Sequence, residues 1–151
     1  MRPSRLLILV GSAFAVAAGA FGYTLTGQTW PQGSTVTMHL SLGGDQTLID
    51  GSTSFGESAE NGLAQWNQYL SRLQYSVVRN SSLTPQSGDR RNSVFFSSTV
   101  YRESFDSTTL AVTLRTSVGS TIVETDVIFN SAKSWNSYRG PLPGVERRHL
   151  A

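Results

Sequence analysis

The chain has 151 residues, no cysteine and a formal net charge of +2. Two of its twelve basic residues lie in the N-terminal segment, which leaves ten basic and ten acidic residues in 21–151 and excludes a strongly basic nucleic-acid-binding surface. Without cysteine, disulfides, cysteine-based zinc sites and a thiol nucleophile are excluded as well. The length fits one domain with a sizeable core.

The N-terminal residues predict an export signal. Two arginines precede an apolar run over residues 6–17, and residues 18–20 (Ala-Gly-Ala) have the small side chains of a cleavage site. We therefore expect a signal peptide over residues 1–20 and a secreted or extracytoplasmic domain. The alternative is an uncleaved segment that anchors the protein in a membrane, since the run up to Phe21 approaches the roughly 20 residues that span a bilayer.

The next two segments predict a lead-in and a first strand. Residues 21–34 are rich in Gly, Thr and Gln, which favours an extended lead-in with Trp30 as an anchor against the domain. Residues 35–42 alternate between apolar and polar side chains, as a half-buried strand does. His39 lies on the polar face without a second histidine nearby, so we expect a surface residue rather than a metal ligand.

A helix and two further strands are predicted next. Apolar residues from Phe55 to Leu73 recur at steps of three and four, which predicts a helix of about five turns on a sheet, and Ser54 is one of its candidate N-caps. Strands are expected at residues 74–79 and from Val94 onward. Because a helix joins the first two strands, they should be parallel. The sequence thus predicts an α+β fold, a mixed sheet of about five strands with one long covering helix.

The stretch from Leu110 to Trp135 predicts a hairpin with a glycine-containing turn. On its second strand Glu124 and Asp126 share a face with Ile122, Ile128 and Asn130. We expect Asp126 to be a hydrogen-bonded structural acid.

This stretch resembles the segment that precedes the catalytic helix in matrixin-like zinc metallopeptidases of the metzincin group. Leu110, Ala111, Val112 and Thr113 match an "LAHA"-like edge strand, and residues 126–130 with Trp135 match a "GD.HFD...W"-like strand. Most of the chain after residue 28 fits the same template. The resemblance implies a catalytic-domain scaffold over residues 35–151. It also implies a peptide or protein substrate that pairs with Leu110, Ala111 and Val112 at a sheet edge.

The chain departs from this family where the chemistry lies. The zinc signature HExxHxxGxxH would be expected shortly after residue 148, and it is not among these 151 residues. Val112 and Ile128 stand where matrixins have histidines for a structural zinc, and His149 is interpreted as a tail residue. Asp126 and Asn130 fall where the family has acids beside a calcium ion, so a calcium site is an alternative role for them, although Ca2+ needs about six to eight oxygen ligands. Zinc is thus implied for a full-length member, whereas for this chain we expect no catalytic residue, metal ligand or cofactor. The favoured interpretation is an inactive, truncated or degenerate metalloendopeptidase domain, and the sequence does not decide whether the chain is an enzyme.

Two other functions are compatible with the sequence. The first is a non-catalytic exported module that binds a peptide or a glycan through a sheet edge or through Tyr101, Trp135 and Tyr138. The second is a hydrolase that uses Glu124 and Asp126, since side chains two apart on a strand are about 6.5–7 Å apart, as in inverting glycosidases.

The resemblance also implies an exposed surface. In the family the catalytic helix covers one face of the sheet. Without it, apolar residues such as Val94, Phe96 or Ile128 are expected to be partly exposed.

Overall fold

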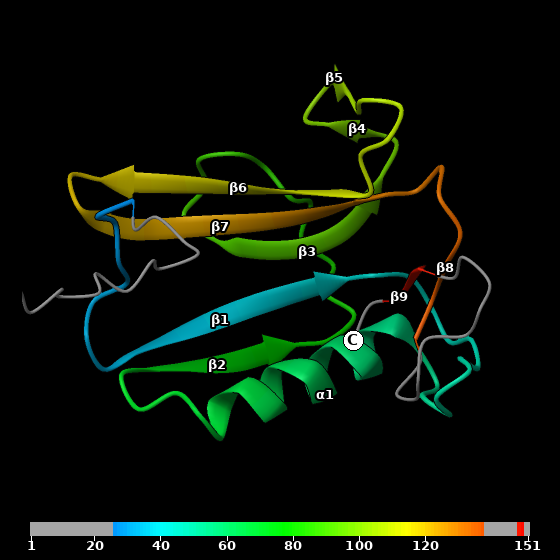
Figure 1. Cartoon of the computed structure of the whole chain (residues 1–151), viewed down its shortest axis with the longest axis horizontal. Coiled ribbons are helices and arrows are strands. Elements are labelled where there is room, and N and C mark those ends of the chain that lie inside the picture. The colour runs from blue at the N-terminus through cyan, green and yellow to red at the C-terminus, as the bar shows by residue number, and fades with distance from the viewer. Residues whose placement is uncertain (1–25, 138–147, 150–151) are drawn as a thin grey trace, which may run out of the picture.

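The computed structural model of the chain describes residues 26–137 and the backbone of residues 148–149 (Figure 1). Its centre is a five-stranded sheet with the strand order β2-β1-β3-β7-β6. β1 lies parallel to β2 and β3, β7 lies parallel to β3, and β6 lies antiparallel to β7. The strands are β1 (Ser34–Ser41), β2 (Leu73–Val78), β3 (Asn92–Ser97), β6 (Ala111–Val118) and β7 (Thr121–Asn130).

One helix, α1 (Phe55–Asn67), connects β1 to β2 and lies on one side of the sheet (Figure 1). The predicted α+β class, the mixed sheet of about five strands, the parallel β1 and β2 and the β6–β7 hairpin are confirmed. Four short strands were not predicted. They form an antiparallel and a parallel pair and are β4 (Thr99–Val100) with β5 (Glu103–Ser104), and β8 (Trp135–Asn136) with β9 (Arg148–His149).

The helix is shorter than predicted, 13 residues instead of about five turns. It ends at Asn67 because that side chain is bound to β2: Nδ2 donates to the Tyr75 carbonyl at 2.8 Å, and Oδ1 accepts from the Tyr75 N–H at 2.7 Å. The side-chain amide of Gln74 donates to the carbonyl of Asn67, which α1 no longer satisfies. Trp66, which the periodicity placed on the sheet-facing stripe, is 63% exposed. The expectation of a long covering helix was therefore wrong.

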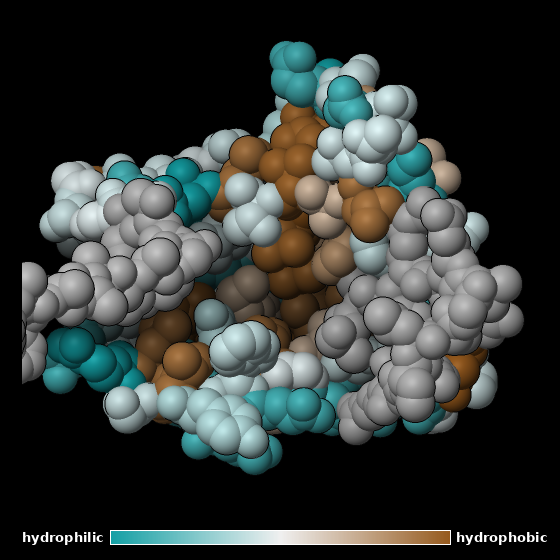
Figure 2. Space-filling view, in the orientation of Figure 1, coloured by the Kyte–Doolittle hydropathy of each residue, from teal (hydrophilic) through white to brown (hydrophobic). Residues whose placement is uncertain are grey.

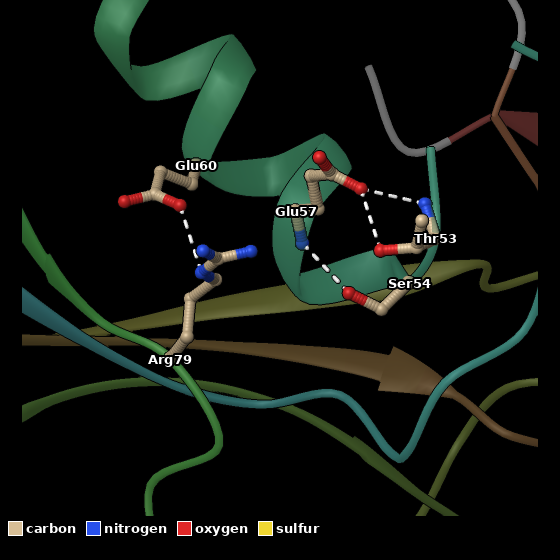
Figure 3. A network of polar contacts seen from close by, with 5 residues as sticks. All are labelled: Thr53, Ser54, Glu57, Glu60 and Arg79. Carbon is tan, nitrogen blue, oxygen red and sulfur yellow. Dashed lines mark hydrogen bonds and ion pairs between the residues drawn. The ribbon is translucent and has the colours of Figure 1, made fainter. Parts of the chain in front are cut away.

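The start of α1 is fixed by a capping network (Figure 3). Ser54 is the N-cap, and its Oγ accepts from the N–H of Glu57 at 3.0 Å. The Glu57 carboxylate in turn accepts from the N–H and the hydroxyl of Thr53, at 2.6 and 2.8 Å. The first bond satisfies a donor that a helix start leaves free, and the other two tie the residue before the N-cap to the first turn. The ion pair between Arg79 and Glu60 (2.9 Å) is about half exposed and contributes little.

The two faces of the sheet are built differently. The face toward α1 carries the apolar core, to which Phe55 of the helix adds an edge-to-face contact with Phe96 at 5.2 Å. The buried members of this core are Val36, Met38, Leu40, Leu42, Leu48, Phe55 and Val94. On β7 the residues of the other face are buried as well, and they include Glu124 and Asp126. The sheet therefore has a polar buried layer on the side away from the helix.

The expected exposure of sheet residues is only partly observed. Phe96 is half-buried, whereas Val94 is 7% exposed and packs in the core. Ile128 is fully buried on the face opposite α1, where loops rather than a helix cover the sheet. The expectation for Val94 and Ile128 was thus wrong. Within the described residues no helix is both long enough and apolar enough to span a membrane.

The capping network yields a stability prediction. Ser54→Ala removes the acceptor for the Glu57 N–H, so we expect the free energy of unfolding to fall by about 1 kcal/mol in urea denaturation. Ser71→Ala is the matched control, because Ser71 is exposed in the loop after α1, and it should change this free energy by less than about 0.5 kcal/mol. Equal losses for the two variants would contradict the assignment of Ser54 as the cap.

Candidate peptide-binding edge

β6 forms one edge of the five-stranded sheet, and among the described strands it pairs with β7 alone. The register is regular from Ala111 opposite Phe129 to Thr116 opposite Glu124, and a bulge follows between Thr116 and Ser117. The strand contains no proline and no lysine, two residue types that often block exposed edges. β6 therefore offers a regular, unpaired edge over residues 111–116.

One hydrogen bond fixes the direction of the backbone groups along β6. The carbonyl of Leu110 accepts from the Asn130 N–H at 2.8 Å, so Leu110 faces β7. In an antiparallel ladder, successive residues direct their N–H and C=O groups to opposite sides. Hence Ala111, Thr113 and Arg115 present theirs outward, and Val112 and Leu114 face β7. Of the three residues assigned to substrate pairing, Ala111 alone directs its backbone groups away from β7.

The outward residues also share a side of the sheet. Ala111 lies opposite Phe129, Thr113 opposite Val127 and Arg115 opposite Thr125, on the side that carries α1. Thr113 and Arg115 are exposed, and Ala111 is half-buried. Within the described part of the chain, the Arg115 side chain makes no ion pair or hydrogen bond. Thr113 and Arg115 were missed as candidates, because the sequence does not show which residues of an edge strand face outward.

An apolar groove of about 210 Å³ lies between α1 and the strands β3 and β7. Figure 2 shows apolar surface across this side of the molecule, in the view of Figure 1. Phe129 lies in the groove and packs edge-to-face on Trp135 at 4.9 Å. The other lining residues are Met38, Leu40, Ala59, Gly62, Leu63, Trp66, Val94 and Val127.

On the opposite side of the sheet, Glu124 holds a loop. Its side chain is 2% exposed, Oε1 accepts from the Gly88 N–H at 2.7 Å, and Oε2 accepts from the Arg90 N–H at 2.6 Å. Arg90 adopts a positive φ of 62° beside this carboxylate. Since both oxygens bind backbone donors, Glu124 acts as a clamp for the segment before β3.

Asp126 holds a second segment. Its side chain is 1% exposed, Oδ1 accepts from the Ser93 N–H at 3.0 Å, and Oδ2 accepts from the Tyr101 hydroxyl at 2.6 Å. Burial raises the pKa of Asp126, an effect that these two hydrogen bonds oppose. Burial also raises the pKa of Tyr101, and the bond to Asp126 adds to that shift. Asp126 is thus a hydrogen-bonded structural acid, as expected.

These contacts argue against a glycosidase-like carboxyl pair. Glu124 and Asp126 do share a face of β7, but both are buried, and all four of their oxygens already accept hydrogen bonds from the protein. A catalytic pair must instead face a substrate between the two groups. The two acids therefore stabilise the fold.

Asn92, for which no role was predicted, is also buried in this layer. Its Nδ2 donates to the Thr37 carbonyl at 3.1 Å, and its Oδ1 accepts from the Thr125 N–H at 2.8 Å. Since Thr37 lies on β1 and Thr125 on β7, this amide joins the two strands that flank β3.

In the described part of the chain, no group of three His, Cys, Asp or Glu side chains is placed to hold a metal. Val112 and Ile128, which replace the family's histidines, lie directly opposite each other on β6 and β7. Asn130, considered as a calcium ligand beside Asp126, already accepts from the Ala132 N–H at 3.0 Å. His39 is half-buried, with Nδ1 3.4 Å from a serine hydroxyl. The His149 side chain lies outside the described residues.

The aromatic residues considered for glycan binding are engaged in packing. The Tyr101 ring lies 5.9 Å from Phe95, and Trp135 donates its ring N–H to the Asn130 carbonyl at 3.0 Å besides packing on Phe129. Tyr138 lies outside the described residues. The geometry therefore gives an open backbone edge with a neighbouring apolar groove, and no aromatic platform from Tyr101 and Trp135.

No family model, no curated protein and no solved structure matches the chain.

The polar layer yields a pH prediction. A carboxyl group whose pKa is raised by folding favours the folded state below its unfolded pKa, near 3.8 for Asp126, and loses that contribution as pH rises through the folded value. Asp126→Asn cannot ionise. We therefore expect wild type to lose stability relative to this variant as pH rises from 3 to 7, measured by urea denaturation.

Asp106 is a control with the opposite sign. It is exposed, and hydrogen bonds from the Thr108 N–H and hydroxyl lower its pKa. Its contribution is therefore present above its unfolded pKa and lost on acidification. Wild type should gain stability relative to Asp106→Asn over the same rise in pH. If the stability of wild type changed in the same direction relative to both variants, burial would not be the effect that sets the pKa of Asp126.

Proposed function

We propose that this chain is the sheet-bearing part of an exported, matrixin-like zinc metalloendopeptidase domain, and that these residues hold an extended peptide along β6. The zinc signature is not among the 151 residues, so the role proposed for them is to bind the peptide and not to cleave it. In a full-length member, the helix that carries the signature would provide the zinc ligands. Export rests on the predicted signal peptide over residues 1–20.

The observation that carries the proposal is the position of β6. β6 is an edge strand and lies antiparallel to β7, whereas the other four strands of the five-stranded sheet are parallel to one another. It coincides with the segment that resembles the family's substrate-pairing strand. The apolar groove between α1 and β7 adds support, because the family places its catalytic helix on one face of the sheet.

Strand addition explains how such an edge binds a peptide. Ala111, Thr113 and Arg115 present N–H donors and C=O acceptors outward, and an extended peptide can satisfy both kinds of group. Each net hydrogen bond contributes about 0.5–1.5 kcal/mol, so several in a row give measurable affinity without special side chains.

A non-catalytic exported peptide-binding module is the second candidate, and it uses the same edge. Peptide is favoured over glycan as its ligand because Tyr101 and Trp135 are occupied by packing and hydrogen bonds. The two candidates differ in whether a zinc-bearing segment completes the domain.

Proline substitution tests strand addition. The exported chain is incubated with a pool of short random-sequence peptides, and retained peptides are quantified by mass spectrometry. Thr113→Pro removes an outward N–H, which an edge strand tolerates, and we expect binding to weaken by about twofold to tenfold. Thr113→Val keeps the N–H and the branched shape, so it should bind as wild type does. Equal binding by the proline variant, or no retained peptide, would contradict the proposal.

Metal content tests where the chemistry resides. After dialysis we expect the 151-residue chain to retain no stoichiometric zinc and to bind peptides equally with and without a chelator, because the described residues bring no three ligands together. Stoichiometric zinc, or chelator-sensitive cleavage of a peptide, would show that this chain does contain the reactive centre.

A further inference from the structure

If a peptide pairs with β6 as proposed, the side chains along β6 determine which peptide sequence binds best. β6 is free of bulges from Ala111 to Arg115, so a paired strand keeps one register over this length. Residues directly opposite each other in an antiparallel pair place their side chains on the same face, about 4.5–5.5 Å apart. Each peptide side chain can therefore be assigned a neighbour on β6.

Arg115 brings to this edge a positive charge that no acid among the described residues pairs with. It is exposed on the α1 side of the sheet, where its neighbour on β7 is Thr125. Glu124 and Asp126, the acids of β7, are buried on the opposite face and bind other groups. A carboxylate on the peptide, opposite Arg115, would complement this charge.

Ala111 leaves space at the other end of the same face. Its methyl group lies opposite Phe129, which packs on Trp135, and both rings are half-buried. A large apolar side chain opposite Ala111 can extend over this small residue toward the two rings. Removing that apolar surface from water favours binding.

Val112 and Leu114 alternate with the outward residues and lie on the other face of the sheet. Val112 and Leu114 are half-buried there, and Leu110 beside them is 40% exposed. The two peptide residues opposite Leu114 and Val112 therefore meet apolar neighbours, which favours β-branched side chains at those two positions.

We propose that β6 selects an antiparallel peptide with an acidic residue opposite Arg115 and a large apolar residue four positions later, opposite Ala111. This inference rests on the proposed docking function and adds its sequence preference. In one-letter code the pattern is [DE]-β-x-β-Φ, where β is a β-branched residue and Φ a large apolar one. Because antiparallel pairing fixes the order, the reversed sequence should bind less well.

The probe is a fluorescent, end-blocked peptide containing Glu-Val-Thr-Val-Phe, titrated with the exported chain and followed by anisotropy at low salt. Replacing Glu by Gln, or Phe by Ala, should each weaken binding roughly twofold to fivefold. The effect of Glu should shrink as salt is added, because the pair is exposed. Reversing the sequence should remove both preferences.

A charge exchange isolates Arg115. Arg115→Glu should weaken binding of the Glu-Val-Thr-Val-Phe probe and strengthen binding of the same probe with Lys in place of Glu, each by roughly twofold to fivefold. Arg91→Glu makes the same charge change at an exposed loop position before β3, so it should leave the order of the two probes unchanged. A preference for the Glu probe that survives Arg115→Glu would overturn the inference.

N-methylation separates this inference from the docking itself. A methyl group on the probe's Thr nitrogen blocks the bond to Thr113, whereas one on either Val nitrogen points away from β6. Strand docking predicts that only the first weakens binding. If it does and the charge exchange has no effect, the sequence preference is wrong and docking stands. If methylation at Thr has no effect, the docking proposal is overturned too.

Discussion

The burial of two carboxylates on β7 is the constraint on which the rest of this structure depends. A buried charge costs several kcal/mol unless hydrogen bonds replace its water. Glu124 meets this requirement with the N–H groups of Gly88 and Arg90, and Asp126 with Ser93 and the Tyr101 hydroxyl. Three of these bonds hold the 88–90 loop and the turn at Tyr101 against the back of the sheet. The fourth, from Ser93, joins β3 to β7.

This arrangement leaves one side and one edge of the sheet for binding. α1 covers part of the other face, and an apolar groove remains between it and β7. β6 is fixed to β7 by a regular ladder, so its outward backbone groups are presented by a strand whose neighbour is held from behind. A rigid edge beside an apolar groove suits an extended peptide better than a compact ligand, because affinity then comes from repeated main-chain bonds.

Much of the fold follows from periodicity in the sequence. The alternation in residues 35–42 predicted β1, and the alternation after Leu110 predicted the hairpin and the shared face of Glu124 and Asp126. The end of α1 did not follow, because the apolar stripe continues to Leu73 and a tertiary contact, Asn67 with Tyr75, ends the helix. Local periodicity cannot report a bond between a helix and a strand.

The site was predictable to a similar degree. The sequence predicted the segment at Leu110 as the peptide-binding edge. Which residues direct their backbone groups outward depends on which ones hydrogen-bond to β7, and the hydropathy pattern does not contain that information. Ile128 was expected to be partly exposed because the resemblance assigned the cover of one sheet face to the family's catalytic helix. Only the loops held by the acids show that this face is covered.

Amide hydrogen exchange along β6, with and without saturating Glu-Val-Thr-Val-Phe peptide, tests the central claim most directly. The outward N–H groups of Ala111, Thr113 and Arg115 should exchange quickly in the free chain and slow when the peptide pairs with them, whereas Val112 and Leu114, already bonded to β7, should change little. This alternating pattern is the result that peptide pairing at β6 predicts. Uniform protection along β6, or protection confined to the opposite edge at β2, would contradict it.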